Sequence, residues 1–78
     1  APAVPDPVVR REVQERVRQA FRLLPVKYRV TATLALIEER PYAEIAEALG
    51  TSVGTVKSRV ARAQQLLRTK LTNLGMKP

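Results

Sequence analysis

Cysteine and histidine are both absent from the 78 residues. Without thiols the chain can form neither disulfides nor thiolate metal sites, and it is consistent with a reducing compartment. A histidine general base and a cysteine nucleophile are therefore both unavailable. The sequence also has no glycine-rich phosphate loop, and the carboxylate pair Glu38-Glu39 is best explained as a solvated helix end. These absences argue against an enzyme, and we expect neither a cofactor nor a metal site.

Long apolar runs are missing as well. No stretch approaches the ~18 apolar residues that a membrane span needs. The first residues, APAVPDPVV, contain neither the basic region nor the apolar core of a signal peptide. We therefore expect a cytoplasmic protein with no membrane insertion. A chain of this length forms one domain at most and buries only roughly 60–65% of its unfolded surface, which favours a small helical core.

Acidic side chains are absent after Glu47. The first 47 residues carry eight basic and seven acidic side chains, a net charge of +1, and the remaining 31 residues carry the other +6 of the total of +7. A face that only improves solubility usually mixes both signs, whereas a basic half of this kind predicts an interaction with phosphate. The basic residues in that half are Lys57, Arg59, Arg62, Arg68, Lys70 and Lys77.

Residues 1–6 are rich in proline and have no helical period, so we expect a disordered linker there and a folded domain over residues 7–76. Asp6-Pro7 is a helix start, with Asp6 as N-cap and Pro7 at the first helical position. The helix is predicted to run to about Leu24. Its apolar face is predicted to belong to the core rather than to a partner surface, and consists of Val9, Val13, Val17, Ala20, Phe21 and Leu24.

A second helix is expected to open at Pro25 and to end before Pro41, which can also begin the next helix. It is apolar nearly all round, which predicts a central, buried helix. Its main face is predicted to be Val26, Val30, Thr33, Leu34 and Ile37. A strand over residues 30–37 is the alternative, because β-branched residues partly alternate there, but no partner strand is apparent.

Two helical patterns separated by one glycine lie in residues 42–75. A short helix is expected over Tyr42–Leu49, and Gly50 ends it in a left-handed conformation. Thr51 and Ser52 are candidate N-caps for a long helix that starts at about Ser52 and ends near Gly75. The apolar face of that helix is predicted to be Val53, Val56, Val60, Ala63, Leu67, Leu71 and Leu74. Helix, glycine turn and helix predict an all-α, four-helix domain with a C-terminal helix-turn-helix.

The stretch YAEIAEALGTSVGTVKSRVARA, which begins at Tyr42, resembles region 4 of bacterial sigma factors, in particular the extracytoplasmic-function (ECF) group. The run SVGTVKSR directly after Leu49-Gly50 is the most specific part of this resemblance. Leu24-Pro25 and Tyr28-Arg29 match the same pattern upstream, so that the resemblance covers about residues 24–71. It implies binding to the minus-35 promoter element and to the β flap of RNA polymerase, and an anti-sigma factor as a further partner. It does not extend to a domain that melts DNA.

The helical wheel predicts which residues face DNA. The face opposite the valines carries Gly54, Ser58, Ala61, Arg62 and Gln65, with Thr55 and Lys57 beside it. The N-terminal half of a recognition helix enters the major groove, where arginine or lysine can donate to guanine O6 and N7 and serine can contact a base edge or the backbone. The resemblance implies base contacts at the positions of Lys57, Ser58, Ala61 and Arg62, although relatives often carry an aromatic residue or histidine at the position of Ala61.

Backbone contacts are expected around the start of the same helix. Thr51, Ser52 and Thr55 offer hydroxyl groups to phosphates beside the positive end of the helix dipole. Arg59 is interpreted either as a phosphate contact or as an ion-pair partner of Glu44 or Glu47. Tyr42 has two readings, a hydroxyl contact with phosphate, which the resemblance implies, and packing on the recognition helix.

For Gly54 two interpretations also remain open, a close approach of the helix to DNA and a harmless glycine in the first turn. At the level of function, two other classes stay open. One is the helix-turn-helix domain of a response regulator or repressor, and the other is a mainly protein-binding module held by an anti-sigma factor or polymerase.

Overall fold

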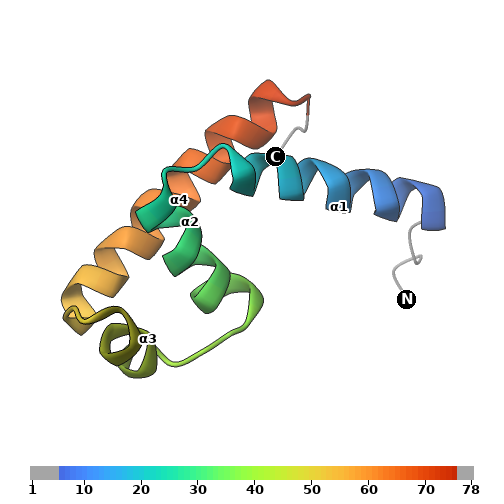
Figure 1. The fold of residues 1–78 in the computed structure, drawn as a ribbon. Coiled ribbons are helices and arrows are strands. Elements are labelled where there is room, and N and C mark those ends of the chain that lie inside the picture. Colours follow the sequence, from blue (N-terminus) through green and yellow to red (C-terminus); the bar gives the residue numbers. More distant parts are fainter. Residues whose placement is uncertain (1–5, 76–78) are drawn as a thin grey trace.

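The computed structural model describes residues 6–75, which form four α-helices and one short π-helical segment (Figure 1). The predicted all-α fold is confirmed, and the strand alternative for residues 30–37 is wrong. The predicted linker, apart from Asp6, and the last three residues lie outside the described part of the chain. In chain order the elements are α1 (Pro7–Arg22), α2 (Val26–Ala32), η1 (Thr33–Ile37), α3 (Tyr42–Leu49) and α4 (Val53–Asn73).

Helix α1 begins where the sequence predicts. The Asp6 carboxylate accepts a hydrogen bond of 2.8 Å from the Val8 backbone N–H, and Pro7 is the first helical residue. The helix ends after Arg22, where the Leu23 N–H donates to the carbonyls of Gln19 and Ala20. The predicted end at Leu24 is therefore two residues too late.

Neither Pro25 nor Pro41 is itself the first helical residue, although α3 covers Tyr42–Leu49 as predicted. Both are N-caps with extended backbone, φ −54° and ψ 148° at Pro25 and φ −59° and ψ 142° at Pro41, and the helices α2 and α3 begin at the residues after them. Neither proline donates a backbone hydrogen bond, and an N-cap needs none. Pro41 also does not itself end the preceding helix, which stops at Ile37.

Helix α2 continues into η1 without a break, since Ala32 and Thr33 both have right-handed helical backbone. The Glu38 N–H donates to the Thr33 carbonyl at 3.0 Å, five residues back, which is the bond of a π-helical turn. Next, the Arg40 N–H donates to the Leu34 carbonyl at 3.0 Å. Glu39 between them has a φ of 54°, which is uncommon for a residue other than glycine.

Arg40 joins the end of η1 to the start of α3. Its guanidinium forms ion pairs with Glu38 Oε1 at 2.9 Å and Glu44 Oε1 at 3.0 Å. The bonds to Glu38 and to Glu44 raise the pKa of Arg40 above its ordinary value, so this arginine stays charged. The side chain thus connects two elements across the loop 38–41.

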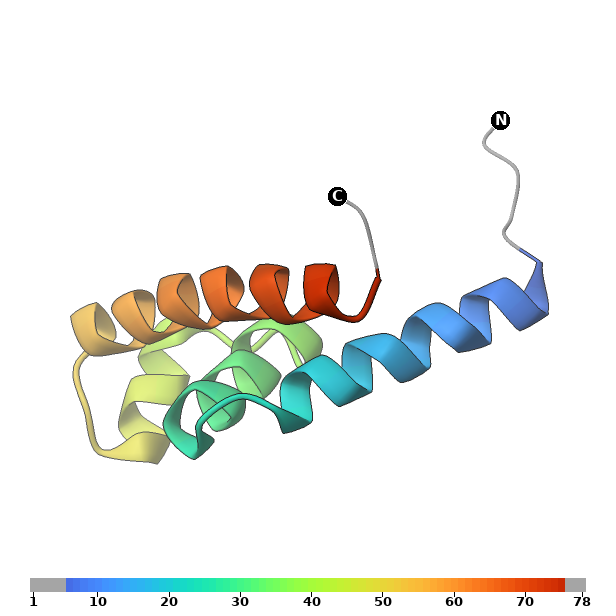
Figure 2. The same cartoon turned by 90° about the horizontal axis from the view of Figure 1, so that it is seen from above.

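The core consists of two clusters, and α4 contributes to both. One is formed by Ala20, Leu24, Ala32, Ala63 and Leu67, and joins α1 and α2 to the C-terminal half of α4. The other is formed by Ile45, Ala46, Val56 and Val60, and joins α3 to the N-terminal half of α4. Figure 2 shows α4 along one side of the molecule with α2 and α3 packed against it. This helix is therefore the element against which the other helices pack.

The predicted buried face of the helix that continues from α2 into η1 is correct at Leu34, which is half-buried and packs against the cluster between α3 and α4, and wrong at Val26, Val30 and Ile37. Val26 is 63% exposed, Val30 38% and Ile37 59%, whereas Thr31 and Ala32 are completely buried. The observed inner face consists of Tyr28, Thr31, Ala32 and Ala35, which follow a helical spacing of their own. Small side chains let α2 approach α4 closely, and the Thr31 hydroxyl is satisfied by donating to the Lys27 carbonyl at 2.8 Å.

The predicted core role of α1 is correct only for its C-terminal half. Ala20 is completely buried and Leu24, just after the helix, is 3% exposed, but Val9 and Val13 are 50% and 41% exposed. Figure 2 shows why, since the first turns of α1 extend away from the other helices. Consistently, the Cα radius of gyration is 14.1 Å, against about 11–12 Å for a compact chain of this length. Within residues 6–75 no helix combines the length and hydropathy of a membrane span.

Candidate nucleic-acid interface

The turn between α3 and α4 has the predicted geometry. Gly50 adopts the left-handed conformation with φ 66° and ψ 38°, and the Thr51 N–H reaches back to the Ala46 carbonyl at 2.9 Å. A bond that spans five residues across a left-handed glycine is typical of a Schellman helix end. No atom lies within 4 Å of the position that a Gly50 Cβ would occupy, so this glycine is required by its backbone angle and not by a lack of space.

Of the two N-cap candidates, Thr51 and Ser52, it is Ser52 that caps α4. Its Oγ accepts a bond of 3.1 Å from the Thr55 N–H and donates one of 3.0 Å to Thr55 Oγ1. The Ser52 hydroxyl is therefore already used within the cap. Thr55, which accepts from Ser52, keeps its own hydroxyl proton for an acceptor such as a phosphate oxygen.

Helix α4 separates its faces as the sequence predicts. Of the seven apolar positions, four are buried, Leu71 and Leu74 are half-buried, and Val53 is 39% exposed. The four buried positions are Val56, Val60, Ala63 and Leu67. The opposite face is exposed to solvent and carries Gly54, Lys57, Ser58, Ala61, Arg62 and Gln65, which we call the reading face. All six residues were predicted to face DNA.

Within residues 6–75, no cation of α4 forms an ion pair. The ion pairs there involve Glu15, Glu38 and Glu44, and their arginine partners all lie outside α4. The predicted ion pair of Arg59 with Glu44 or Glu47 is therefore not formed. Arg59 is half-buried at the edge of the reading face. Arg62 is exposed, and its Nη1 donates to Gln65 Oε1 at 3.2 Å, a contact that orients the guanidinium along the helix.

Tyr42 and Gly54 differ from the other predicted contacts. Tyr42 is half-buried and packs against the cluster between α3 and α4, so its packing role is observed, and its phosphate contact stays a prediction. Gly54 is exposed, and a Cβ there would meet only Ser52 Oγ at 3.8 Å. The protein itself therefore tolerates a side chain at position 54. Within residues 6–75 no cluster of three acidic side chains could hold a metal ion.

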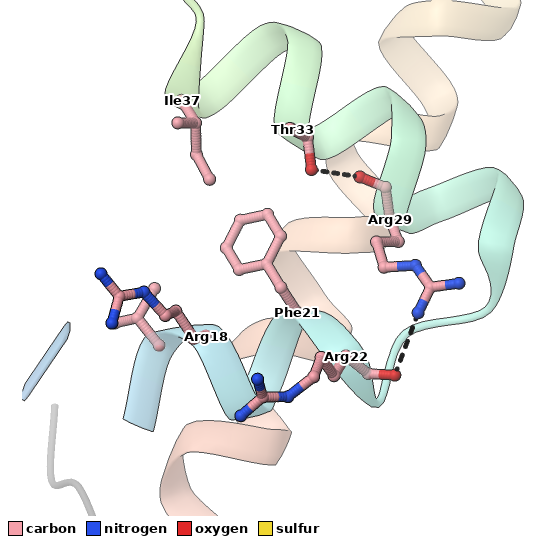
Figure 3. A pocket seen from close by; sticks show the side chains of 7 residues that line it. Arg18, Phe21, Arg22, Arg29, Thr33 and Ile37 are labelled. Carbon is pink, nitrogen blue, oxygen red and sulfur yellow. Dashed lines mark hydrogen bonds between the residues drawn. The ribbon is translucent and has the colours of Figure 1, made fainter. Parts of the chain in front are cut away.

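A second surface, which the sequence did not predict, is a groove between α1 and the α2–η1 rod, shown in Figure 3. Its volume is about 250 Å³. The floor is apolar and the rim carries three guanidinium groups. It is lined by Val17, Arg18, Phe21, Arg22, Arg29, Thr33 and Ile37, and we call it the arginine-rimmed groove.

Two ion pairs and one hydrogen bond connect the residues at the rim of this groove. Glu15 pairs with Arg22 at 3.1 Å and with Arg18 at 3.6 Å, and Arg29 Nη1 donates a long bond of 3.4 Å to the Arg22 carbonyl. Two sequence signals could have revealed the groove, namely the apolar stripes of α1 and α2 that were assigned to the core. Both stripes remain partly exposed, and they flank the same depression.

Comparisons with known proteins agree with this geometry. Residues 14–67 match the family model described as sigma-70, region 4. The ECF RNA polymerase sigma factor SigW of Bacillus subtilis is 41% identical over 69 residues, which are 88% of this chain and 37% of SigW. RNA polymerase sigma factor SigV of the same species is 38% identical over 56 residues, which are 72% of this chain and 34% of SigV.

A third relative is the ECF RNA polymerase sigma factor SigE of Mycolicibacterium smegmatis, 40% identical over 55 residues, which are 70% of this chain and 21% of SigE. The matched parts of the chain thus span between about a fifth and just over a third of the length of these relatives. The matched family model covers α2, η1 and α3 completely, together with the reading face of α4. The chain belongs to the sigma-70 region 4 family, as a region 4 domain of the kind found in ECF sigma factors.

Proposed function

We propose that this domain is the C-terminal promoter-recognition domain of an alternative sigma factor of the ECF group, and that it binds the minus-35 promoter element in duplex DNA. The observation that carries the proposal is the reading face of α4. It follows a left-handed glycine turn, it is exposed, and its cations are not neutralised by carboxylates in residues 6–75. A basic, unpaired face at the start of the second helix of a helix-turn-helix is what a major groove accepts.

Base reading falls to the exposed polar side chains of the first two and a half turns of α4. Arg62 can donate two bonds to one guanine, Lys57 reaches the same acceptors, and Ser58 contacts a base edge. Gly54 has no side chain, which lets the start of the helix approach the groove closely. The fold itself would tolerate a Cβ at this position, so packing within the protein does not explain the glycine. Arg59 and Thr55 lie at the side of the face and bind phosphate oxygens.

RNA polymerase is the second partner, and we assign its β flap to the arginine-rimmed groove. The apolar floor of Val17, Phe21 and Ile37 suits the apolar face of a helix. No residue of α4 lines the groove, so the groove and the reading face are separate sites that can be occupied at the same time. An anti-sigma factor that occupies the groove would compete with polymerase. Because the polymerase works in the cytoplasm, so does this domain.

A selection of bound sequences from random duplex DNA tests the DNA-binding proposal. We expect the 78-residue chain to enrich duplexes that share one short sequence motif of fixed length. The Arg62→Ala variant should no longer enrich this motif. Enrichment of a palindrome bound by a dimer would instead support a repressor. No enrichment, together with binding of a polymerase fragment, would support a domain that only binds proteins.

Binding of a peptide with the flap-tip sequence of a bacterial RNA polymerase β subunit tests the groove. Ile37→Ser should weaken peptide binding, because Ile37 lines the groove and is 59% exposed. Val26→Ser is the matched control, since Val26 is also an exposed aliphatic residue of the same rod (63%) but does not line the groove. Equal losses in both variants would contradict the assignment.

A further inference from the structure

Arg62 is the arginine of the reading face, and its guanidinium is held by a neutral side chain. Nη1 of Arg62 donates to Gln65 Oε1 at 3.2 Å, three residues further along α4. A guanidinium can only donate, so the amide atom that faces it is the oxygen. In residues 6–75 the other side chains that accept from a guanidinium are the carboxylates of Glu15, Glu38 and Glu44. Arg62 is therefore oriented without neutralisation of its positive charge.

The spacing of the two residues along α4 explains this contact. Residues three apart on a helix are neighbours on its surface, and long side chains lean toward the N-terminus of their helix. Gln65 therefore reaches back over the turn that carries Arg62. Both side chains are exposed on the reading face, so they belong to the same binding surface.

The hydrogen bond occupies one edge of the guanidinium and leaves the other edge free. Nε and Nη2 of Arg62 carry two parallel N–H bonds, and the bond to Gln65 uses neither of them. Such a pair of donors matches O6 and N7 of guanine, which both accept on the major-groove edge. An unrestrained arginine can instead turn to a phosphate beside the groove. Holding Nη1 at Gln65, on the same face, keeps the free edge directed away from the sides of the helix.

We propose that Gln65 is a positioning residue, which holds Arg62 so that its Nε and Nη2 read one guanine. This role rests on the proposed function, in which Arg62 contacts a base. An arginine side chain has many rotamers, and fixing it before binding reduces the entropy that is lost when DNA binds. The hydrogen bond becomes stronger when the duplex excludes water from the reading face. Gln65 thus sets the base preference through Arg62 and not through a base contact of its own.

Gln65→Met tests this role, because methionine has a similar length and helix propensity but no strong acceptor. Fluorescence anisotropy gives the affinities of the 78-residue chain for the preferred duplex from the selection and for duplexes changed at one base pair each. The base pair read by Arg62 is the one at which Arg62→Ala relaxes the preference. At this base pair we expect Gln65→Met to lower the preference by about three- to ten-fold, while the affinity for the changed duplex stays within about two-fold of the parent.

Two further variants serve as controls. Gln64→Met should leave the preference unchanged, since Gln64 is an exposed glutamine of α4 outside the reading face. Gln65→Glu keeps an acceptor for Nη1 and adds a negative charge. It should weaken binding to all duplexes and retain the preference at the base pair of Arg62. A glutamine that read adenine through its own amide would lose its preference in Gln65→Glu, because that contact requires the amide donor.

A double variant separates positioning from an independent contribution. In the Arg62→Ala background, Gln65→Met should change the preference by less than about two-fold, because the side chain that Gln65 positions is gone. An equal loss in both backgrounds, a loss at a different base pair, or an unchanged preference in Gln65→Met would overturn the positioning role, while base reading by Arg62 stands. If Arg62→Ala relaxes the preference at no base pair, base reading by Arg62 fails first and the role of Gln65 fails with it.

Discussion

At the scale of single residues, Gly50 and Gly54 show how two glycines in one motif can serve different purposes. Gly50 has a φ of 66° with empty space around its missing Cβ, so only its backbone angle excludes other residues. Gly54 has an ordinary helical φ and a single distant neighbour, so nothing in the protein excludes a side chain. Packing within the fold therefore does not require glycine at position 54.

Gly50→Val should destabilise the domain by roughly 1–3 kcal/mol, because a β-branched residue is strained in the left-handed conformation. Urea unfolding measures this. Gly54→Ala is the control and should leave stability unchanged or raise it by up to about 1 kcal/mol, because alanine favours helix over glycine. An unchanged midpoint for Gly50→Val would mean that the turn does not need the observed angle.

The reading face allows a residue-scale test of base against phosphate contacts. Arg62→Ala should cost roughly 1–3 kcal/mol on the preferred duplex and relax the preference at one or two base pairs. Arg59→Ala should weaken binding to preferred and scrambled duplexes alike, because a phosphate contact carries no sequence information. Neither residue belongs to the buried stripe, so melting curves of both variants should match the parent.

Binding of both variants to the two duplexes decides between the roles. If Arg62→Ala weakens binding to the preferred and the scrambled duplex equally, Arg62 is a phosphate contact. The residues that read bases would then lie on another side of α4. Unchanged DNA affinity with a loss of flap-peptide binding would instead assign this face to a protein partner.

At the scale of elements, the sequence predicted α4 and the turn well and α2 poorly. The stripe of α4 has apolar residues on one side and polar residues on the other, so the period identified the buried face directly. In α2 apolar residues surround the helix, and the period could not choose between faces. The small residues Thr31 and Ala32 proved to be inside because they allow close helix packing, which depends on the partner helix and not on local sequence.

Two further features could not be predicted from the sequence for similar reasons. The π turn of η1 is defined by the carbonyls to which the Glu38 and Arg40 N–H groups donate, and the local sequence does not specify this choice. The arginine-rimmed groove forms only when α1 and η1 lie beside each other. Its lining residues are distant along the chain, since Val17 and Thr33 are 16 residues apart. The helical patterns contain the residues of the groove but not their proximity.

The corrected face of α2 makes a prediction at this scale. Ala32→Leu should destabilise the domain by about 1–3 kcal/mol, because Ala32 is completely buried against α4 and three added carbons have no space. The same change at the exposed Ala43 of α3 should alter stability by less than about 0.5 kcal/mol. Thermal unfolding followed by circular dichroism compares the two. Equal stability of both variants would mean that Ala32 is not in the core and that the buried face of α2 is the one predicted from the sequence.

At the scale of the whole molecule, the charges fall into two groups that differ in how they are neutralised. The groove arginines 18 and 22 share the carboxylate of Glu15, and Arg40 is held between two glutamates. The five cations of α4 have no such partners in residues 6–75. The α4 group therefore presents an unscreened positive surface to a polyanion, whereas the other cations without an ion pair in residues 6–75 lie outside the helix-turn-helix.

This division predicts the salt dependence of DNA binding. Each phosphate neutralised by the protein lowers the slope of log affinity against log salt by about 0.9. Since not every cation of α4 reaches the duplex, we expect roughly three to six contacts and thus a slope of about −3 to −5. Arg59→Ala should flatten that slope by about one unit. Arg18→Ala should leave it unchanged, because Arg18 pairs with Glu15 at the groove and lies outside α4. A salt-independent affinity, or a slope that responds equally to Arg18 and Arg59, would mean that the duplex is not held by α4.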